Sequence, residues 1–120
     1  MHELSIAMSI VELAEEEAER RSVQVNAVHL KLGALSGVAK EALLSCYEMA
    51  CEGTLLQGSR LLVEDVPVVI FCALCRAQRP LGSMQLFCCS ECGTPCSEIV
   101  QGKELEIVSL EIQECVPNPV

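Results

Sequence analysis

Apolar residues near the start of the chain recur at the three- and four-residue spacing of an amphipathic helix. The stripe consists of Ile6, Ile10, Leu13 and Ala14, widened by Met8, Val11 and Ala18. The acidic run 15–17 precedes Arg20 and Arg21, and acid-before-base pairs at i,i+4 are typical of an exposed helix face. We therefore expect a helix from about residue 4 to residue 21.

A second helix is predicted over about residues 38–52. Its expected core positions are Val38, Ala42, Cys46 and Met49. Gly53 follows the last turn, where glycine commonly terminates a helix in the left-handed conformation.

Strand periodicity appears in three places. Val28, Leu30 and Leu32 alternate with the polar residues His29 and Lys31, which predicts a strand from about residue 25 to Gly33 with a change of phase near Asn26. Residues 61–63 predict a second strand that ends at Pro67, and residues 105–112 a third with a phase change at Ile107-Val108. The pattern favours an α/β fold, a small mixed sheet with two helices.

The composition changes between Pro67 and Gly102. Six of the nine cysteines lie there, and regular apolar periodicity stops. A segment of about 36 residues cannot bury enough apolar surface to fold without a staple. We expect a metal ion to supply it, and we expect a domain at 67–103 inserted into a domain formed by 1–66 and completed by a strand in 104–120.

The cysteine spacing predicts the ligands of that metal. Two CxxC pairs, Cys72/Cys75 and Cys89/Cys92, are separated as in a zinc ribbon, and soft thiolates favour Zn(II). Four thiolates leave no open coordination position, so the zinc is expected to be structural. Cys88 and Cys96 lie nearby, and the registers 88/92 and 92/96 compete with 89/92. Cysteines outside the cluster are expected to be small buried side chains: Cys46, Cys51 and Cys115.

The net charge of the chain reduces the number of possible classes of function. The formal net charge is −9, which disfavours nucleic-acid binding and suits cation handling. The start of the chain carries an acid where a secretory signal has cations, and no apolar run is long enough to cross a membrane. We expect a cytoplasmic protein, in which cysteines bind metals more often than they form disulfides.

The first residues form a candidate chelate for a second metal. The amine of Met1, the amide nitrogen of His2 and the imidazole Nδ1 of His2 can close fused five- and six-membered rings, and the Glu3 amide can add another. Deprotonated amides favour planar Ni(II) or Cu(II). The other histidine, His29, is expected on the polar face of its strand as a surface residue.

Several motifs occur in an order that resembles one family. They are Met1-His2-Glu3-Leu4-Ser5, Gly33-Ala34-Leu35-Ser36, Gly53-Thr54, the paired CxxC motifs, Glu104-Leu105-Glu106-Ile107 and Ser109-Leu110-Glu111-Ile112. Together they resemble the HypA/HybF family of hydrogenase nickel-incorporation proteins over essentially the whole chain. Two positions depart from the pattern: Ala39, where some members have an acid, and Ser90, where proline is common.

The resemblance implies a nickel metallochaperone, not an enzyme. It implies nickel binding by Met1, His2 and Glu3, and structural zinc binding by Cys72, Cys75, Cys89 and Cys92. It also implies partners: the GTPase HypB, the [NiFe]-hydrogenase large subunit and, as further candidates, urease accessory proteins. The protein is expected as a monomer or homodimer that binds neither nucleic acid nor membrane. Nickel is expected to pass on by ligand exchange, with Arg76, Gln78 and Arg79 as exposed contact residues of the ribbon.

Two other classes of function compete with this interpretation. One is a zinc-ribbon adaptor that mediates protein–protein contacts without a nickel role. The other is a thiol oxidoreductase that uses Cys72 or Cys89, which requires a metal-free CxxC at a helix N-terminus.

Overall fold

The computed structural model describes residues 2–84 and 86–114, which fold into two helices and six strands in two compact units. The first unit comprises residues 2–30, 38–64 and 106–114, and the second comprises Lys31–Gly37 and Asp65–Leu105. Met1 and Cys115, both named as candidates from the sequence, lie outside the described residues. The expected α/β fold with a small sheet and two helices is confirmed.

The first sheet has the strand order β2-β1-β6. These strands are β1 (Val23–Gly33), β2 (Arg60–Val66) and β6 (Leu105–Glu114). The N–H of Ala34, just past β1, donates to Val66 at the end of β2, whereas the Gly33 N–H donates to Glu104 just before β6. Strand β2 is therefore parallel to β1, and β6 is antiparallel to it, so the sheet is mixed.

Strand β1 begins at Val23, two residues earlier than predicted. Its adjacent residues Ala27 and Val28 are both buried, so the alternation changes phase there, beside Asn26 as expected. The strand ends at Gly33, where a Cβ would lie 2.1 Å from the Gly102 carbonyl oxygen. Only glycine permits this approach of the two backbones.

Helix α1 (Glu3–Arg21) confirms the predicted element, with a different buried stripe. Its buried residues are Ala7, Ile10, Val11, Ala14 and Ala18. The prediction that Met8 and Leu13 belong to the core is wrong, because they are 57% and 54% exposed. Alanines fill the i, i+7 and i+11 positions that start at Ala7, and Val11 fills the i+4 position, so Met8 and Leu13 fall on the flanks.

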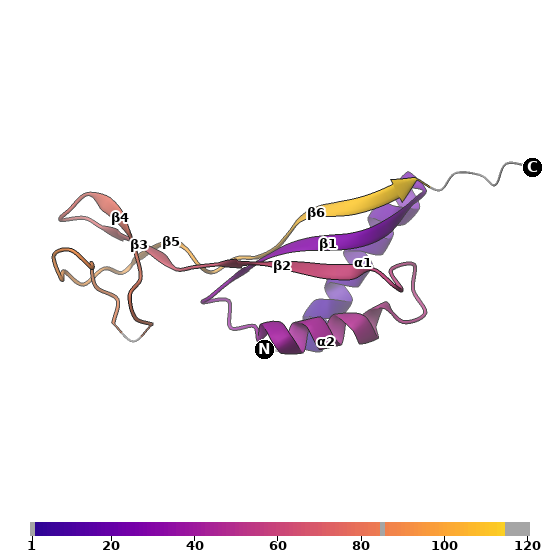
Figure 1. The fold of residues 1–120 in the computed structure, drawn as a ribbon, viewed down its shortest axis with the longest axis horizontal. Coiled ribbons are helices and arrows are strands. Elements are labelled where there is room, and N and C mark those ends of the chain that lie inside the picture. The colour runs from indigo at the N-terminus through magenta and orange to yellow at the C-terminus, as the bar shows by residue number, and fades with distance from the viewer. Residues whose placement is uncertain (1, 85, 115–120) are drawn as a thin grey trace, which may run out of the picture. The chain divides into compact units, whose positions relative to one another are not determined.

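Helix α2 (Lys40–Cys51) buries Leu43, Tyr47 and Cys51, a stripe at i, i+4 and i+8. The predicted positions Val38 and Cys46 lie at its edge and are partly buried, but Met49 is 57% exposed, so that assignment is wrong. Gly53 adopts φ 74°, which confirms the glycine expected after the helix. In Figure 1, α2 runs along the strands and α1 crosses behind them.

The second unit is a small antiparallel sheet with the order β4-β3-β5. Its strands are β3 (Val69–Cys72), β4 (Ala77–Pro80) and β5 (Glu98–Gln101). The buried cluster of this unit consists of Val68, Ile70, Cys72, Cys89 and Cys96. Cysteines therefore make up most of the buried cluster of this unit, whereas aliphatic side chains make up most of the buried cluster of the first unit.

Neither described helix is long and apolar enough to span a bilayer.

Candidate metal centre

Four cysteine sulfurs of the second unit converge on one point. Cys72 ends β3, Cys75 lies in the turn that follows, and Cys89 and Cys92 bracket a second turn. The four sulfur atoms all lie within 4.8 Å of one another. The Cys72 and Cys92 sulfurs are 3.6 Å apart, and the Cys75 and Cys89 sulfurs are 3.9 Å apart. Each close pair joins the two CxxC turns, so both turns are needed to form the site.

The two CxxC turns share two local features, a backbone N–H directed at the first sulfur and a positive φ after the second cysteine. The N–H of Cys75 donates to Cys72 Sγ, and the N–H of Glu91 donates to Cys89 Sγ, both at 3.4 Å. The residue after each second cysteine has a positive φ, 54° at Arg76 and 75° at Gly93. Backbone donors directed at the first sulfur of each turn stabilise negative charge there.

The thiol pKa values reflect the crowding of the four sulfurs. Backbone N–H groups of Cys92 and Glu91 lower the pKa of Cys89 to about 6. The Thr94 hydroxyl, 3.0 Å from Cys92 Sγ, lowers the pKa of Cys92. The neighbouring sulfurs of Cys92 and Cys72 raise the pKa of Cys75 to about 12. The cluster favours thiolates at its second turn and needs a cation to ionise all four sulfurs.

Cys88 and Cys96 lie beside this cluster without joining its four-sulfur set. The Cys96 thiol is buried and lies 3.2 Å from the Thr94 carbonyl, to which it donates. Burial raises the pKa of Cys96, so this thiol keeps its proton. Cys88 is half-buried and forms a β-bridge with Pro95.

The donor chemistry of the four sulfurs fits Zn(II). Soft thiolates in a four-sulfur set that converges from two turns are the usual ligands of a structural zinc ion. Cys72 ends a strand and Cys89 begins a turn, so neither has the helix N-terminus that a thiol oxidoreductase requires.

Arg79 was expected to be an exposed contact residue of the ribbon, and this expectation is wrong. Its side chain is half-buried, and the guanidinium hydrogen bonds to the sulfurs of Cys89 and Cys75. Arg76 and Gln78 are exposed as expected. The sequence does contain one indication of this position. Arg79 follows Ala77 by two residues, so in a strand the two side chains lie on the same face of the sheet.

The start of the chain forms the second candidate site, of which His2 and Glu3 are described. His2 is exposed and is the N-cap of α1, and its carbonyl accepts the first helical hydrogen bond, from Ile6 at 3.2 Å. The Glu3 carboxylate accepts the N–H of Ala39, the N-cap of α2, at 3.2 Å. This bond lowers the pKa of Glu3 and holds the starts of both helices together.

The other histidine is a surface residue, as expected. His29 Nε2 lies 2.7 Å from a carboxylate oxygen of Glu111 on the neighbouring strand β6.

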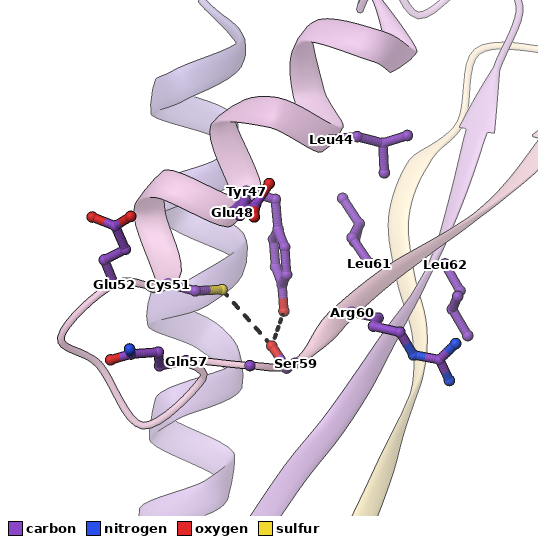
Figure 2. Close-up of a pocket in the computed structure, with 11 residues that line it drawn as sticks. Leu44, Tyr47, Glu48, Cys51, Glu52, Gln57, Ser59, Arg60, Leu61 and Leu62 are labelled. Atoms are coloured by element: carbon purple, nitrogen blue, oxygen red, sulfur yellow. Dashed lines mark hydrogen bonds between the residues drawn. The ribbon is translucent and has the colours of Figure 1, made fainter.

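A groove with a volume of about 630 Å³ lies between α2 and the start of β2. Figure 2 shows the Ser59 hydroxyl between Tyr47 and Cys51. The Ser59 oxygen is 2.7 Å from the Tyr47 hydroxyl oxygen and 3.8 Å from Cys51 Sγ. Burial raises the pKa of Tyr47. These contacts join α2 to β2, so Cys51 is a packing residue, as the sequence predicted.

An α/β unit combined with four converging cysteines that could hold a metal ion is the arrangement expected of a metal-handling protein. The chain matches the family described as "Hydrogenase/urease nickel incorporation, metallochaperone, hypA" over residues 1–112. The chain therefore belongs to the HypA family, whose members are metallochaperones rather than enzymes.

Relatives support the same assignment. The hydrogenase maturation factor HypA of Chloroflexus aurantiacus is 49% identical over 112 residues, covering 92% of this chain and 98% of that protein. The factor of a Roseiflexus species is 46% identical over 119 residues, covering 98% of this chain and 97% of that protein.

Two solution structures share the fold. The nickel metallochaperone HypA of Helicobacter pylori aligns with a TM-score of 0.65 at 27% identity, covering 95% of this chain and 99% of that one. Another HypA protein aligns with a TM-score of 0.70 at 26% identity, covering 94% and 97%.

Proposed function

We propose that this protein carries Ni(II) on Met1, His2 and Glu3 and helps to insert it into [NiFe]-hydrogenase during maturation. The start of α1 carries the proposal. His2 is exposed, and its carbonyl accepts the first helical hydrogen bond of α1. An ion held there is open to the ligands of a receiving protein.

The backbone around His2 suits amide coordination. Because the first helical donor is the N–H of Ile6, the amides of His2 and Glu3 precede the hydrogen-bonded part of α1. The Glu3 N–H contacts its own carboxylate. Loss of these amide protons to Ni(II) therefore costs α1 no helical hydrogen bond. Since imidazole and amides must lose protons to bind, nickel affinity falls as pH falls.

We further propose that Cys72, Cys75, Cys89 and Cys92 hold a structural Zn(II). A bound zinc ion supplies a cross-link between the two CxxC turns. The thiolates of this set leave no position for an exchanging ligand, so the proposed cargo site and the proposed structural site differ in kind. In this assignment residues 1–66, completed by 104–120, form the nickel domain, and residues 67–103 form the zinc domain.

The proposed partners follow from the family. The relatives are named hydrogenase maturation factors, and the family description includes urease as well as hydrogenase. We propose that the chain acts in the cytoplasm with the GTPase HypB and the hydrogenase large subunit, with urease accessory proteins as further partners.

A nickel titration with matched histidine variants tests the proposal. The native untagged chain, His2→Ala and His29→Ala are titrated with Ni(II), followed by isothermal calorimetry and by the absorption of planar Ni(II). We expect loss of the site in His2→Ala and its retention in His29→Ala. The zinc content should be the same in all three chains.

An extended N-terminus provides a second test. Two extra residues before Met1 remove the α-amine from the chelate, so nickel binding should fall while zinc is retained. Unchanged nickel binding by both His2→Ala and the extended chain would favour a zinc-ribbon adaptor without a nickel role.

A further inference from the structure

The pairing of β3 with β4 places Arg79 on the same face as the cysteine cluster. Residues directly opposite each other in an antiparallel pair share one face of the sheet. Cys72 is paired with Ala77, and Ile70 is paired with Arg79. Cys72 and Ile70 are both fully buried. The side chain of Arg79 therefore projects to the interior of the second unit, in line with the cysteine that ends β3.

The guanidinium of Arg79 contacts two of the candidate ligands and keeps one donor unused. It hydrogen bonds to the sulfurs of Cys89 and Cys75, one from each CxxC turn. Its Nε is buried and has no hydrogen-bond partner among the described residues. A buried unsatisfied N–H is costly, and cationic donors in such positions serve anionic acceptors. This arrangement suits a centre that carries negative charge.

Four thiolates around one divalent cation carry an excess of two negative charges. An arginine in contact with two of the sulfurs offsets one of these charges and supplies hydrogen bonds in a fixed planar geometry. The other arginine of the segment, Arg76, is exposed and follows Cys75 directly. It provides a matched control, because it has the same charge and lies closer in sequence to the cysteines.

We propose that Arg79 is a positioning residue of the metal centre, whose guanidinium bridges Cys75 and Cys89 and retains the bound ion against chelators. This inference rests on the proposed metal site at the four cysteines. By bonding one sulfur from each turn, Arg79 holds the turns together on the side where Cys75 is only half-buried. Its loss leaves these two sulfurs open to an incoming ligand and so opens a route for ligand replacement.

Zinc release from the full-length chain tests the role of Arg79. Zinc-loaded wild type, Arg79→Gln, Arg79→Lys and Arg76→Gln are mixed with a chromophoric chelator at one neutral pH, and the release rate is followed. Removal of residues that support metal ligands typically costs about 10–100-fold in affinity. We therefore expect Arg79→Gln to release zinc about 10–100-fold faster than wild type. Arg79→Lys should be intermediate, and Arg76→Gln should match wild type.

Cobalt substitution provides a readout that general destabilisation does not mimic. The sulfur-to-Co(II) charge-transfer band should shift in Arg79→Gln and Arg79→Lys while Arg76→Gln keeps the wild-type band. Equal release rates and bands in wild type and both Arg79 variants would overturn the inference, as would equal effects of Arg76→Gln and Arg79→Gln. A wild-type chain that holds no zinc or cobalt would instead overturn the proposed metal site itself.

Discussion

The two units have different kinds of interior. The first buries aliphatic side chains from both helices and the sheet, together with Tyr47 and Cys51. In the buried cluster of the second unit, cysteines supply three of the five residues, and the other two are Val68 and Ile70. Apolar burial stabilises the first unit, whereas the smaller apolar cluster of the second unit is the reason why we propose that a metal ion at its sulfurs stabilises it.

The two candidate metal sites also differ in the burial of their ligands. The sulfurs of Cys72 and Cys89 are buried in a set that comes from two turns, which suits an ion that stays. His2 is exposed at the first turn of α1, which suits an ion that leaves. If both proposed assignments hold, this short chain keeps one ion by drawing its ligands from two turns with two of them buried, and releases the other from an exposed end of a helix.

Removal of the metal from the second unit is the largest expected change. Structural zinc sites contribute about 10–16 kcal/mol of apparent binding free energy in small peptides. In Cys72→Ser, or after chelation, we expect the second unit to unfold while both helices remain. Two-dimensional NMR should show collapse of the amide dispersion for 65–105, with little loss of helical circular dichroism.

Cys88→Ser is the matched control for this experiment, because Cys88 is half-buried and outside the four-sulfur set. It should retain zinc and the folded spectrum. A second unit that stays folded in Cys72→Ser would show that its few buried apolar residues suffice, which removes the contrast between the units.

Truncation of the first core is the second largest change. Leu43 is fully buried on α2, so Leu43→Ala should lower the free energy of unfolding by about 2–5 kcal/mol, measured by urea denaturation. The exposed Met49 on the same helix provides the control, and Met49→Ala should change the stability by less than about 0.5 kcal/mol. Zinc content should be unchanged in both, since zinc loss from Leu43→Ala would mean that the units do not fold separately.

Sequence periodicity predicted the elements of the first unit but not every buried face. Both helices and the strands before Pro67 were predicted from the spacing of apolar residues. The buried face of α2 differs from the predicted one, because Leu43 and Tyr47, rather than Ala42 and Met49, face the core. Strand β3 was not predicted, because it has four residues and ends in a cysteine, too short for alternation to register.

Contacts between residues far apart in the chain could not be predicted from the sequence either. The bond from Ala39 to Glu3 joins positions 36 residues apart, and the approach of Arg79 to Cys89 depends on how β4 pairs with β3. In contrast, the CxxC spacing identified all four sulfurs that converge, because each turn brings its own pair together locally.

Loss of the Tyr47–Ser59 hydrogen bond is expected to have the third largest effect, a smaller decrease in the free energy of unfolding. Tyr47→Phe should cost about 0.5–1.5 kcal/mol of stability near neutral pH. Because the folded pKa of Tyr47 is raised above its ordinary value, the wild type keeps this stability below about pH 10 and loses it as pH rises further. Urea denaturation from pH 7 to pH 11 should therefore show a weaker alkaline decline in Tyr47→Phe. Equal declines in the two chains would contradict the raised pKa.

The smallest expected change removes the charge that joins the two helix starts. In Glu3→Gln the bond to the Ala39 N–H weakens, because an amide is a poorer acceptor than a carboxylate. Since the folded pKa of Glu3 is lowered, its stabilisation is present above the ordinary value of 4.5 and disappears as pH falls through the folded pKa. The melting temperature of Glu3→Gln, followed by helical circular dichroism, should lie slightly below wild type at pH 7 and meet it near pH 3.

Nickel binding by Glu3→Gln distinguishes the role of the Glu3 backbone amide from the role of its side-chain carboxylate. Glutamine keeps the amide nitrogen of residue 3, so Glu3→Gln should bind nickel with the wild-type stoichiometry. A chain that melts as wild type at pH 7 but loses nickel would reverse the assignment: the carboxylate would then be a ligand of the cargo and not the link between the helices. Because Glu3 is only partly buried and makes a single bond to Ala39, we expect its contribution to be the smallest of these four.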